Sequence, residues 1–292
     1  YDFPIDLVYT WVDGNDPVWQ AKNAYWQKQY APDDEYAISP ARWRDRDELK
    51  YSLRSVEQYM PWVNNIYIVT DNQVPAWLNI NHPKIKIVDH SEIFPAEALP
   101  VFNSIAIESR LAHIPDLSEH FIYSNDDFFT ATYLSPDFFF TADGKPIFYQ
   151  ELYSKSYING LLEQYKDEMW AKLWQLPTKL IAEKFGGEPF YMIDTHTMGA
   201  ISKSDFLEAE KIFPEEFKRT TYSKFRTEND LNFGIVSMLE FLNQRVVVKG
   251  ANQVDKKFNC KTAGVLIMGH MEELESKKPC QFCLNDTQTN SE

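Results

Sequence analysis

The chain is poor in positive charge, in cysteine and in glycine. Among its 292 residues, 29 Lys and Arg stand against 43 Asp and Glu, so the formal net charge is −14. Such a charge repels phosphate backbones and anionic lipid surfaces at long range, which argues against general nucleic-acid binding. An enzyme of this charge that handles a phosphate needs a local correction, either a divalent cation or a few well-placed Arg and His.

Cysteine is scarce as well. The three cysteines are Cys260, Cys280 and Cys283, an odd number near the end of the chain. This usage fits a reducing compartment better than a disulfide framework. Cys280 and Cys283 have the spacing of a metal or redox pair, but no second pair or neighbouring His pair completes a zinc site, so we expect a structural or incidental role.

The common nucleotide and hydrolase motifs are also missing. With 10 Gly in the chain, and with neither GxxxxGK[ST] nor GxGxxG, a glycine cradle for phosphate is not expected. G-x-S-x-G and H-E-x-x-H are absent too. The longest apolar runs fall far short of the roughly 20 residues of a membrane helix. The chain starts with Tyr and no signal segment, so we expect it to begin inside a longer protein.

Short apolar runs alternate with helical patterns, which favours a mostly parallel sheet covered on both faces. The predicted strands are Ile5–Val12, Asn65–Thr70, Lys84–Val88 and His120–Ser124. The predicted helices are Arg46–Tyr59, a segment around Ser104–His113, and Glu228–Leu242 behind a capping-box pattern. Residues Glu151–Gly187 differ in character, with apolar residues at helical spacing, and predict a helical insertion in the α/β core.

Asn125, Asp126 and Asp127 directly follow a predicted strand. They are therefore expected at the carboxyl end of that strand, where open α/β sheets bind ligands. Two carboxylates and an amide suit a hard cation such as Mg²⁺, which bridges to substrate phosphate. The alternative is an ordinary turn after a strand, where Asn and Asp are common.

Four further residues are candidates, each with a simpler alternative. Glu108 has apolar neighbours and is either partly buried and functional or part of a solvated helix face. Arg226 precedes an expected helix start and either binds an anion there or pairs with Glu228. His196 is a candidate general base or phosphate ligand, or a structural group. Trp11 either stacks on a base or sugar or packs in the core.

Taken together, these segments resemble the Stealth family, which comprises bacterial capsule and exopolysaccharide phosphotransferases and the catalytic subunit of the animal GlcNAc-1-phosphotransferase. The four matching regions, in chain order, are Ile5–Pro17, segments within Arg46–Phe129, Phe213–Phe233 and Cys283–Thr287. The resemblance spans nearly the whole chain and covers the middle helical segment least. The fourth region lies almost at the chain end, so any family contacts further on are missing here.

The resemblance implies transfer of a sugar-1-phosphate from a UDP-sugar to a glycan hydroxyl, with UMP leaving and a phosphodiester forming. It implies functional acids at Glu108 and Asp127, a functional His at His196, and arginines at Arg54 and Arg226. It also assigns motif positions to Trp11, Asp13, Asn285 and Asp286.

These positions suggest roles in a reaction that depends mostly on positioning and charge stabilisation. We expect Mg²⁺, or Mn²⁺, to be held on the pyrophosphate by residues drawn from Asn125, Asp126, Asp127 and Asp286. Phosphate oxygens are expected at Arg54 and Arg226, and the acceptor proton at His196 or Glu108. Trp11, Asp13 and Asn285 complete the expected substrate contacts.

The expected fold is therefore α/β, with a mostly parallel sheet and a Rossmann-like or GT-A-like nucleotide-sugar core, in one catalytic domain over residues 1–292 with the insertion at 151–187. Two alternatives stay open: a metal-dependent glycosyltransferase that releases UDP, and a non-catalytic glycan-binding module. Few cysteines, compact motif spacing and a single sequon at Asn285 favour the bacterial cytoplasm, at the inner membrane face if peripherally associated, over the Golgi lumen.

Overall fold

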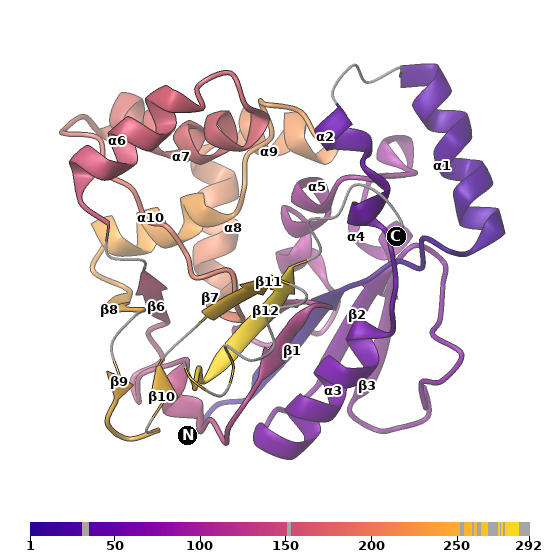
Figure 1. Cartoon of the computed structure of the whole chain (residues 1–292), viewed down its shortest axis with the longest axis horizontal. Coiled ribbons are helices and arrows are strands. Elements are labelled where there is room, and N and C mark those ends of the chain that lie inside the picture. Colours follow the sequence, from indigo (N-terminus) through magenta and orange to yellow (C-terminus); the bar gives the residue numbers. More distant parts are fainter. Residues whose placement is uncertain are drawn as a thin grey trace.

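The computed structural model describes residues 1–30, 35–150, 153–251, 254–258, 260–261, 264–267, 274, 276 and 278–285. Its centre is a five-stranded sheet of order β3-β2-β1-β4-β7 (Figure 1). The strands are β1 (Ile5–Thr10), β2 (Ile66–Thr70), β3 (Ile85–Asp89), β4 (His120–Asn125) and β7 (Gly199–Ser202). The first four are mutually parallel, and β7 pairs antiparallel with β4.

Helices and smaller strands surround this sheet. The helices are α1 (Pro17–Tyr30), α2 (Glu35–Ile38), α3 (Glu48–Tyr59), α4 (His90–Ile93), α5 (Ser104–Glu108), α6 (Lys155–Gln164), α7 (Met169–Phe185), α8 (Lys203–Ile212), α9 (Pro214–Thr221) and α10 (Gly234–Leu242). The smaller strands are β5 (Phe128–Thr130), β6 (Ile147–Gln150), β8 (Val247–Gly250), β9 (Val254–Asp255), β10 (Cys260–Lys261), β11 (Gly264–Ile267) and β12 (Gln281–Asn285). Within the described residues, no helix combines the length and the apolar character needed to cross a membrane.

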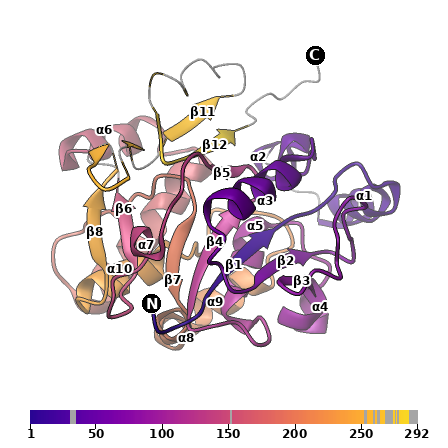
Figure 2. The ribbon, with the colours of Figure 1, turned by 90° about the horizontal axis from the view of Figure 1, so that it is seen from below.

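The middle of the central sheet is buried on both faces, because apolar residues of β1, β2 and β4 point to either side of it. Leu7 and Tyr9 point to one face and pack with Leu49 and Val56 of α3. Val8 points to the other face, into a core that α5, α8, α9 and α10 help to form. Figure 2 shows α3 on one side of the sheet and α8 and α9 on the other. The predicted α/β class with a mostly parallel sheet is confirmed.

The strand order creates a switch point between β1 and β4. β1 pairs with β2 on one side and with β4 on the other, and the last residue of β1, Thr10, lies opposite both Val69 and Asn125. The loops after β1 and β4 therefore leave the same edge of the sheet from neighbouring strands. Open α/β sheets bind their ligands at such a point.

The predicted elements are all present, and the structure adds others. The four predicted strands and the first predicted helix form, with ends shifted by one or two residues. The second predicted helix is shorter, since α5 ends at Glu108 and a 3-10 turn, Leu111–His113, follows. The third begins at Gly234 instead of Glu228. The sequence pattern did not predict several further elements, among them α1, α8, α9 and the edge strand β7.

The late start of α10 has a clear cause in Asp230. Its buried side chain accepts hydrogen bonds from the Thr227 backbone N–H at 2.8 Å and from the Thr227 hydroxyl at 3.0 Å. It also accepts one from Asn103 Nδ2 at 2.8 Å. The expected capping box is thus a turn, which the hydrogen bonds between Thr227 and the Asp230 side chain close. The interpretation of Arg226 as a residue at a helix N-terminus is therefore wrong.

Residues 151–187 are helical where the structure describes them, as α6 and α7. α7 places Ile181 in the core on one face of the central sheet. It ends at Gly186, whose φ of 74° lies in the left-handed region that favours glycine. The segment therefore packs onto the α/β core, while its status as an insertion within a single domain stays a prediction.

The cysteines differ from the expectation. Cys260 and Cys280 form a disulfide, and Cys283 is a buried free thiol. The two bonded cysteines are 20 residues apart in sequence, and their Cα atoms lie 5.2 Å apart. The disulfide differs from the expectation that cysteine usage fits a reducing compartment better than a disulfide framework, so cysteine usage no longer supports that compartment.

Asp6 ties the loops at the amino-terminal edge of the sheet together. Its fully buried carboxylate accepts hydrogen bonds from Asn64 Nδ2 at 2.8 Å, from the Asn65 N–H at 3.0 Å and from the Ser118 N–H at 2.8 Å. Loss of such an acceptor leaves buried donors without a partner, which costs far more than a surface hydrogen bond.

We expect Asp6→Ala to lower the free energy of unfolding by about 2–4 kcal/mol, measured by urea denaturation. The exposed Asp2 offers a matched control, and Asp2→Ala should change the stability by no more than about 0.5 kcal/mol. Equal stability of the two variants would contradict the role of Asp6.

Candidate active site

A cavity of about 1100 Å³ opens at the carboxyl edge of the sheet, at the switch point between β1 and β4. The ends of both strands form part of its wall. The 3-10 turn Pro40–Arg42 and its flanks contribute to the wall, as do α5, the first residues of α3 and α4, and later segments of the chain. Of the predicted site residues, six line this cavity: Trp11, Asn125, Asp126, Asp127, His196 and Arg226.

The acidic triplet is held in place by hydrogen bonds around it. Asn125 Oδ1 lies within hydrogen-bond distance of the Tyr123 hydroxyl, at 2.7 Å. The Asp127 backbone carbonyl accepts from the Leu284 N–H at 3.0 Å, and Asp127 Oδ2 accepts from the Cys283 thiol at 3.4 Å. The other carboxylate oxygen, Asp127 Oδ1, is buried and has no hydrogen-bond partner among the described residues. It is therefore placed for a ligand.

The charges of the pair are poorly compensated. The pKa of Asp126 lies well above its usual value, because the carboxyl is buried and because Asp127, Glu48 and Asp45 add negative charge nearby. Burial also raises the pKa of Asp127, although His196 and the Cys283 hydrogen bond oppose the shift. Two neighbouring buried carboxyls in this state gain stability from a bound cation.

The residues present fit a divalent cation only in part. Asp126 and Asp127 supply two hard oxygen ligands, and Asp127 Oδ1 is an unused one. The part of the chain that the structure describes holds no group of three or more His, Cys, Asp or Glu side chains arranged around an ion. Two carboxylates alone would leave several positions of a cation to water and substrate phosphate, a mode of binding that Mg²⁺ accepts.

The two C-terminal candidates add little here. Asn285 ends β12, but its side chain lies outside the described part of the chain, and Asp286 lies outside the described residues altogether. Their proposed contacts with metal and substrate stay predictions.

Glu108 stands next to the triplet at the end of α5. Its carboxylate accepts a hydrogen bond from the Tyr123 hydroxyl at 2.9 Å, and this hydroxyl also contacts Asn125. Burial raises the pKa of Glu108 to about 7, with the nearby charge of Asp194 adding to the shift and Tyr123 and Arg226 opposing it. A carboxyl with this pKa exchanges a proton readily at neutral pH.

Positive charge lies on the wall of the same cavity. Arg226 lines it and donates a hydrogen bond to the Ser104 hydroxyl at the start of α5. Arg42 and Arg44, from the 3-10 turn Pro40–Arg42 and the residues after it, line it too. Sequence reasoning missed these two, although three arginines within residues 42–46 are a visible signal in a chain of net charge −14.

His196 is exposed and lines the cavity in an unusual backbone conformation. Its φ of 51° is uncommon for a residue with a side chain, and such conformations occur often at functional sites. The Asp194 side chain accepts from the His196 N–H at 3.2 Å, and the His196 ring meets Phe128 edge-on at 5.1 Å. These contacts aim the imidazole next to the acidic triplet.

Two predicted substrate contacts lie outside the cavity wall. Arg54 is exposed on α3 and lies over the Tyr51 ring at 5.4 Å, because the buried face of this helix is formed by Leu49, Ser52 and Val56. Asp13 caps its own turn by accepting from the Asn15 N–H at 2.8 Å. The structure therefore gives neither residue a direct contact with the cavity.

A search of solved structures gives a weak likeness. A crystal structure of the galactosyltransferase LgtC with donor and acceptor sugar analogs aligns with 97% of this chain and 87% of its own chain, at 11% identity and a TM-score of 0.44. This likeness assigns no activity to the chain.

Relatives by sequence are much closer. A capsular polysaccharide phosphotransferase of Haemophilus influenzae is 36% identical over 306 residues, covering 99% of this chain and 79% of that protein. A capsular polysaccharide phosphotransferase of Neisseria meningitidis is 34% identical, covering 97% and 78%. An exopolysaccharide phosphotransferase of Streptomyces coelicolor is 43% identical over 231 residues, but the chain covers 38% of its length.

Three conserved regions of one family match in order along the chain. Stealth conserved region 1 matches residues 3–31, region 2 matches residues 42–148 and region 3 matches residues 195–237. All six predicted residues that line the cavity lie within these regions. The chain belongs to the Stealth family.

Proposed function

We propose that this chain transfers a hexose-1-phosphate or N-acetylhexosamine-1-phosphate from a UDP-sugar to a glycan hydroxyl, releasing UMP and forming a phosphodiester. The observation that carries the proposal is the cavity at the switch point of the sheet. Asp127, whose buried Oδ1 has no hydrogen-bond partner among the described residues, and three arginines line this same cavity. The names of the relatives support a place in capsule or exopolysaccharide synthesis. The expected setting is the bacterial cytoplasm, with peripheral membrane association and the Golgi lumen as alternatives.

The charges suit a pyrophosphate. Arg226, Arg42 and Arg44 offer guanidinium forks, which match phosphate oxygens in geometry and charge. Asp126 and Asp127 would hold Mg²⁺, or Mn²⁺, with Asn125 beside them. When bound, the cation neutralises charge on the pyrophosphate and orients it. The arginines would then stabilise the charge that develops on the transferred phosphoryl group.

The acceptor hydroxyl has to lose a proton as it attacks phosphorus. Two groups are candidates to take it. His196 lines the cavity, whereas Glu108 lies outside the lining, next to Asn125 through the Tyr123 hydroxyl, and its pKa is raised to about 7. A general base works best when its pKa lies near the working pH, a condition that Glu108 meets through its burial. Trp11, in the cavity wall after β1, is placed to pack against the donor.

The rival reaction is glycosyl transfer, in which the same acid pair holds the metal and UDP leaves. The two reactions break different bonds, so the nucleotide product separates them. We expect incubation with UDP-GlcNAc, Mg²⁺ and a panel of glycan acceptors to yield UMP, with a new phosphodiester resonance in the phosphorus NMR spectrum. UDP without UMP would rule out the proposed reaction.

A non-catalytic glycan-binding module makes a third prediction, namely saccharide binding that is indifferent to Mg²⁺ and to Asp127→Asn. The acid pair argues against such a module. Neutral residues could bind a neutral saccharide equally well, so such a site has no need for two carboxyls whose pKa values are raised by burial.

A further inference from the structure

A second cavity adjoins the candidate active site. Its volume is about 310 Å³, and it is lined by the turn after β1, by α1 and by residues 38–44. Three of its lining side chains are amides on successive turns of α1, namely Gln20, Asn23 and Gln27. We call it the amide cavity.

The amide cavity shares part of its wall with the candidate active site. Five residues line both: Trp19, Ile38, Pro40, Trp43 and Arg44. Among the described residues, Asp126, Asp127 and His196 line only the larger cavity. A ligand in the amide cavity therefore lies beside the reacting groups without meeting them, as a remote part of a larger substrate would.

Two glutamines of α1 present carbonyl oxygens to the amide cavity. Gln20 Nε2 donates to the Gly14 carbonyl at 2.8 Å, and Gln27 Nε2 donates to Asn23 Oδ1 at 2.6 Å. In the part of the chain that the structure describes, the side-chain oxygens of Gln20 and Gln27 accept no hydrogen bond. Gln20 is exposed, and the half-buried Gln27 keeps its oxygen open to solvent. Both oxygens are therefore available to hydrogen-bond donors of a ligand.

The lining suits a neutral ligand rich in hydroxyl groups. No carboxylate lines the amide cavity among the described residues, and its one cationic side chain is Arg44. A cationic ligand would meet a like charge, and an anionic ligand would meet the two amide oxygens. Side-chain amides instead accept from hydroxyl groups and donate to them. The half-buried Trp43 ring, 5.5 Å from Trp19, adds a flat apolar surface on which the C–H face of a sugar ring packs.

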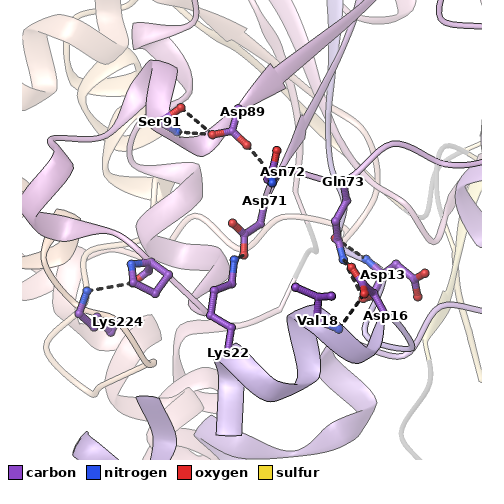
Figure 3. Close-up of polar contacts among 11 residues, drawn as sticks. Asp13, Asp16, Val18, Lys22, Asp71, Asn72, Gln73, Asp89, Ser91 and Lys224 are labelled. Atoms are coloured by element: carbon purple, nitrogen blue, oxygen red, sulfur yellow. Dashed lines mark hydrogen bonds and ion pairs between the residues drawn. The ribbon is translucent and has the colours of Figure 1, made fainter. Parts of the chain in front are cut away.

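The amides belong to a helix that is fixed in place. Gln73, after β2, accepts from the Asp13 N–H at 2.8 Å and donates to Asp16 at 3.2 Å, which holds the turn before α1 against the end of the sheet (Figure 3). Lys22 of α1 forms an ion pair with Asp71, the residue after β2 (Figure 3). The row of amides on α1 therefore has a defined position relative to the strands that build the active site.

The wall formed by residues 38–44 is fixed to the same turn. A Cβ atom at Gly14 would lie 1.9 Å from the Trp43 carbonyl oxygen, so only glycine allows the two backbones to approach this closely. Asn15 Nδ2 donates to the Asp45 carbonyl at 3.0 Å, which ties the next residues to the turn as well. The amide cavity is therefore a preformed site, because both of its walls are held by the turn after β1.

We propose that the amide cavity binds a neutral sugar unit of the acceptor glycan, next to the unit whose hydroxyl reacts. The proposal rests on the proposed function, which makes a glycan the acceptor. A glycan is a chain of units, so an acceptor whose reacting hydroxyl lies near Asp127 and His196 continues beyond these groups. The shared wall offers its next unit the amide cavity. Gln20 and Gln27 are then specificity-determining residues that recognise hydroxyls of this unit.

The test is a binding measurement on the whole chain with Mg²⁺ and UMP present, followed by saturation-transfer NMR. The probes are four neutral disaccharides: maltose, cellobiose, lactose and chitobiose. The variant combines Gln20→Ala with Gln27→Ala. Gln29→Ala is the matched control, since it removes the same side chain from an exposed position of α1 that lines neither cavity. Thermal unfolding checks that each variant folds, and Gln20→Ala alone stands in if the double variant does not.

We expect at least one of the four disaccharides to bind the unchanged chain and Gln29→Ala equally well. The double variant should lose about tenfold or more in affinity for it, because two hydrogen bonds to the ligand are removed. Equal affinity of the double variant and the unchanged chain would overturn the proposal. Absence of binding by all four disaccharides would overturn it as well.

The sugar of the donor is the rival occupant, because a UDP-sugar also carries a sugar unit next to its pyrophosphate. Titration calorimetry with UDP-GlcNAc and with UDP separates the two occupants. If the amide cavity takes the acceptor, the ratio of these two affinities is the same in the double variant and in the unchanged chain. A double variant that lost its preference for UDP-GlcNAc over UDP would assign the amide cavity to the donor and refute the proposal.

The outcome is separable from that of the proposed reaction. UMP release from UDP-GlcNAc, together with disaccharide binding that the double variant retains, leaves the reaction standing and removes the acceptor site. Loss of disaccharide binding in the double variant, in a chain that releases no UMP from the donor, keeps the saccharide site and removes the reaction.

Discussion

Asp127→Asn is expected to reduce sugar-phosphate transfer about 1000-fold or more while leaving the fold intact. The substitution keeps the size of the side chain and removes the charge of a cavity carboxylate whose buried oxygen has no hydrogen-bond partner in the described structure. If Asp127 holds the cation on the pyrophosphate, its loss raises the barrier by about 4 kcal/mol for a 1000-fold effect. Affinity for Mn²⁺, followed by titration calorimetry, should fall with it.

Although Asp127→Asn should lose activity, it should not lose folding stability. Burial raises the pKa of Asp127 above that of the unfolded chain. A raised pKa means that ionisation costs folding free energy, and the cost develops as the pH rises above the unfolded value of 3.8. At pH 7 without metal, asparagine removes this cost. It also removes the negative charge that raises the pKa of the neighbouring Asp126. The melting temperature should therefore stay equal or rise.

The matched control is Asp167→Asn, at an exposed position between α6 and α7. It should change neither the rate nor the metal affinity. If Asp127→Asn kept full turnover, or lost it only through a lowered melting temperature, the role of Asp127 in holding a metal would be wrong.

The sequence was sufficient to locate the acidic side of the site. The apolar runs at residues 5–12 and 120–124 predict parallel strands, and Asn125, Asp126 and Asp127 directly follow the second one. Because parallel strands end at a common edge, the acids and Trp11 could be placed together before any coordinates. The cavity confirms that they lie together.

The basic side of the site could not be located in this way. Arg42 and Arg44 lie in a segment with little regular structure, far in sequence from the acids, so their position depends on tertiary packing. Arg54 shows the reverse. Leu49 and Val56 form the buried face of α3, and the helical spacing relative to them places Arg54 on the exposed face. The family resemblance supplied a role for Arg54 that helical geometry does not support.

Long-range pairing explains the remaining misses. The Cys260–Cys280 disulfide joins residues 20 apart in sequence, and their approach depends on tertiary structure and not on a local pattern. Asp230 closes a turn because Asn103, more than a hundred residues earlier, donates to it inside the core. Local patterns such as a capping box carry no information about either contact.

The pH dependence of transfer is expected to report Glu108. Burial raises its pKa from 4.5 to about 7, so the carboxylate form that accepts a proton becomes abundant only near neutral pH. If Glu108 is the general base, kcat/KM should rise about tenfold per pH unit below pH 7 and level off above it. Glu108→Gln should lower kcat/KM by about 100-fold or more and remove this rise.

A second variant, Tyr123→Phe, tests what sets the pKa of Glu108. The Tyr123 hydroxyl donates to Glu108 and favours the charged form, so Tyr123→Phe should raise the pKa of Glu108 further and move the rising limb to higher pH. Glu210→Gln, which removes a half-buried carboxylate paired with Arg110 and His113 outside the cavity wall, should leave the limb in place. A limb that persists in Glu108→Gln and disappears in His196→Gln would assign the proton to His196 instead. The pH at which kcat/KM rises thus distinguishes the two candidate bases, because Tyr123→Phe shifts this pH only if Glu108, which accepts the Tyr123 hydrogen bond, is the base.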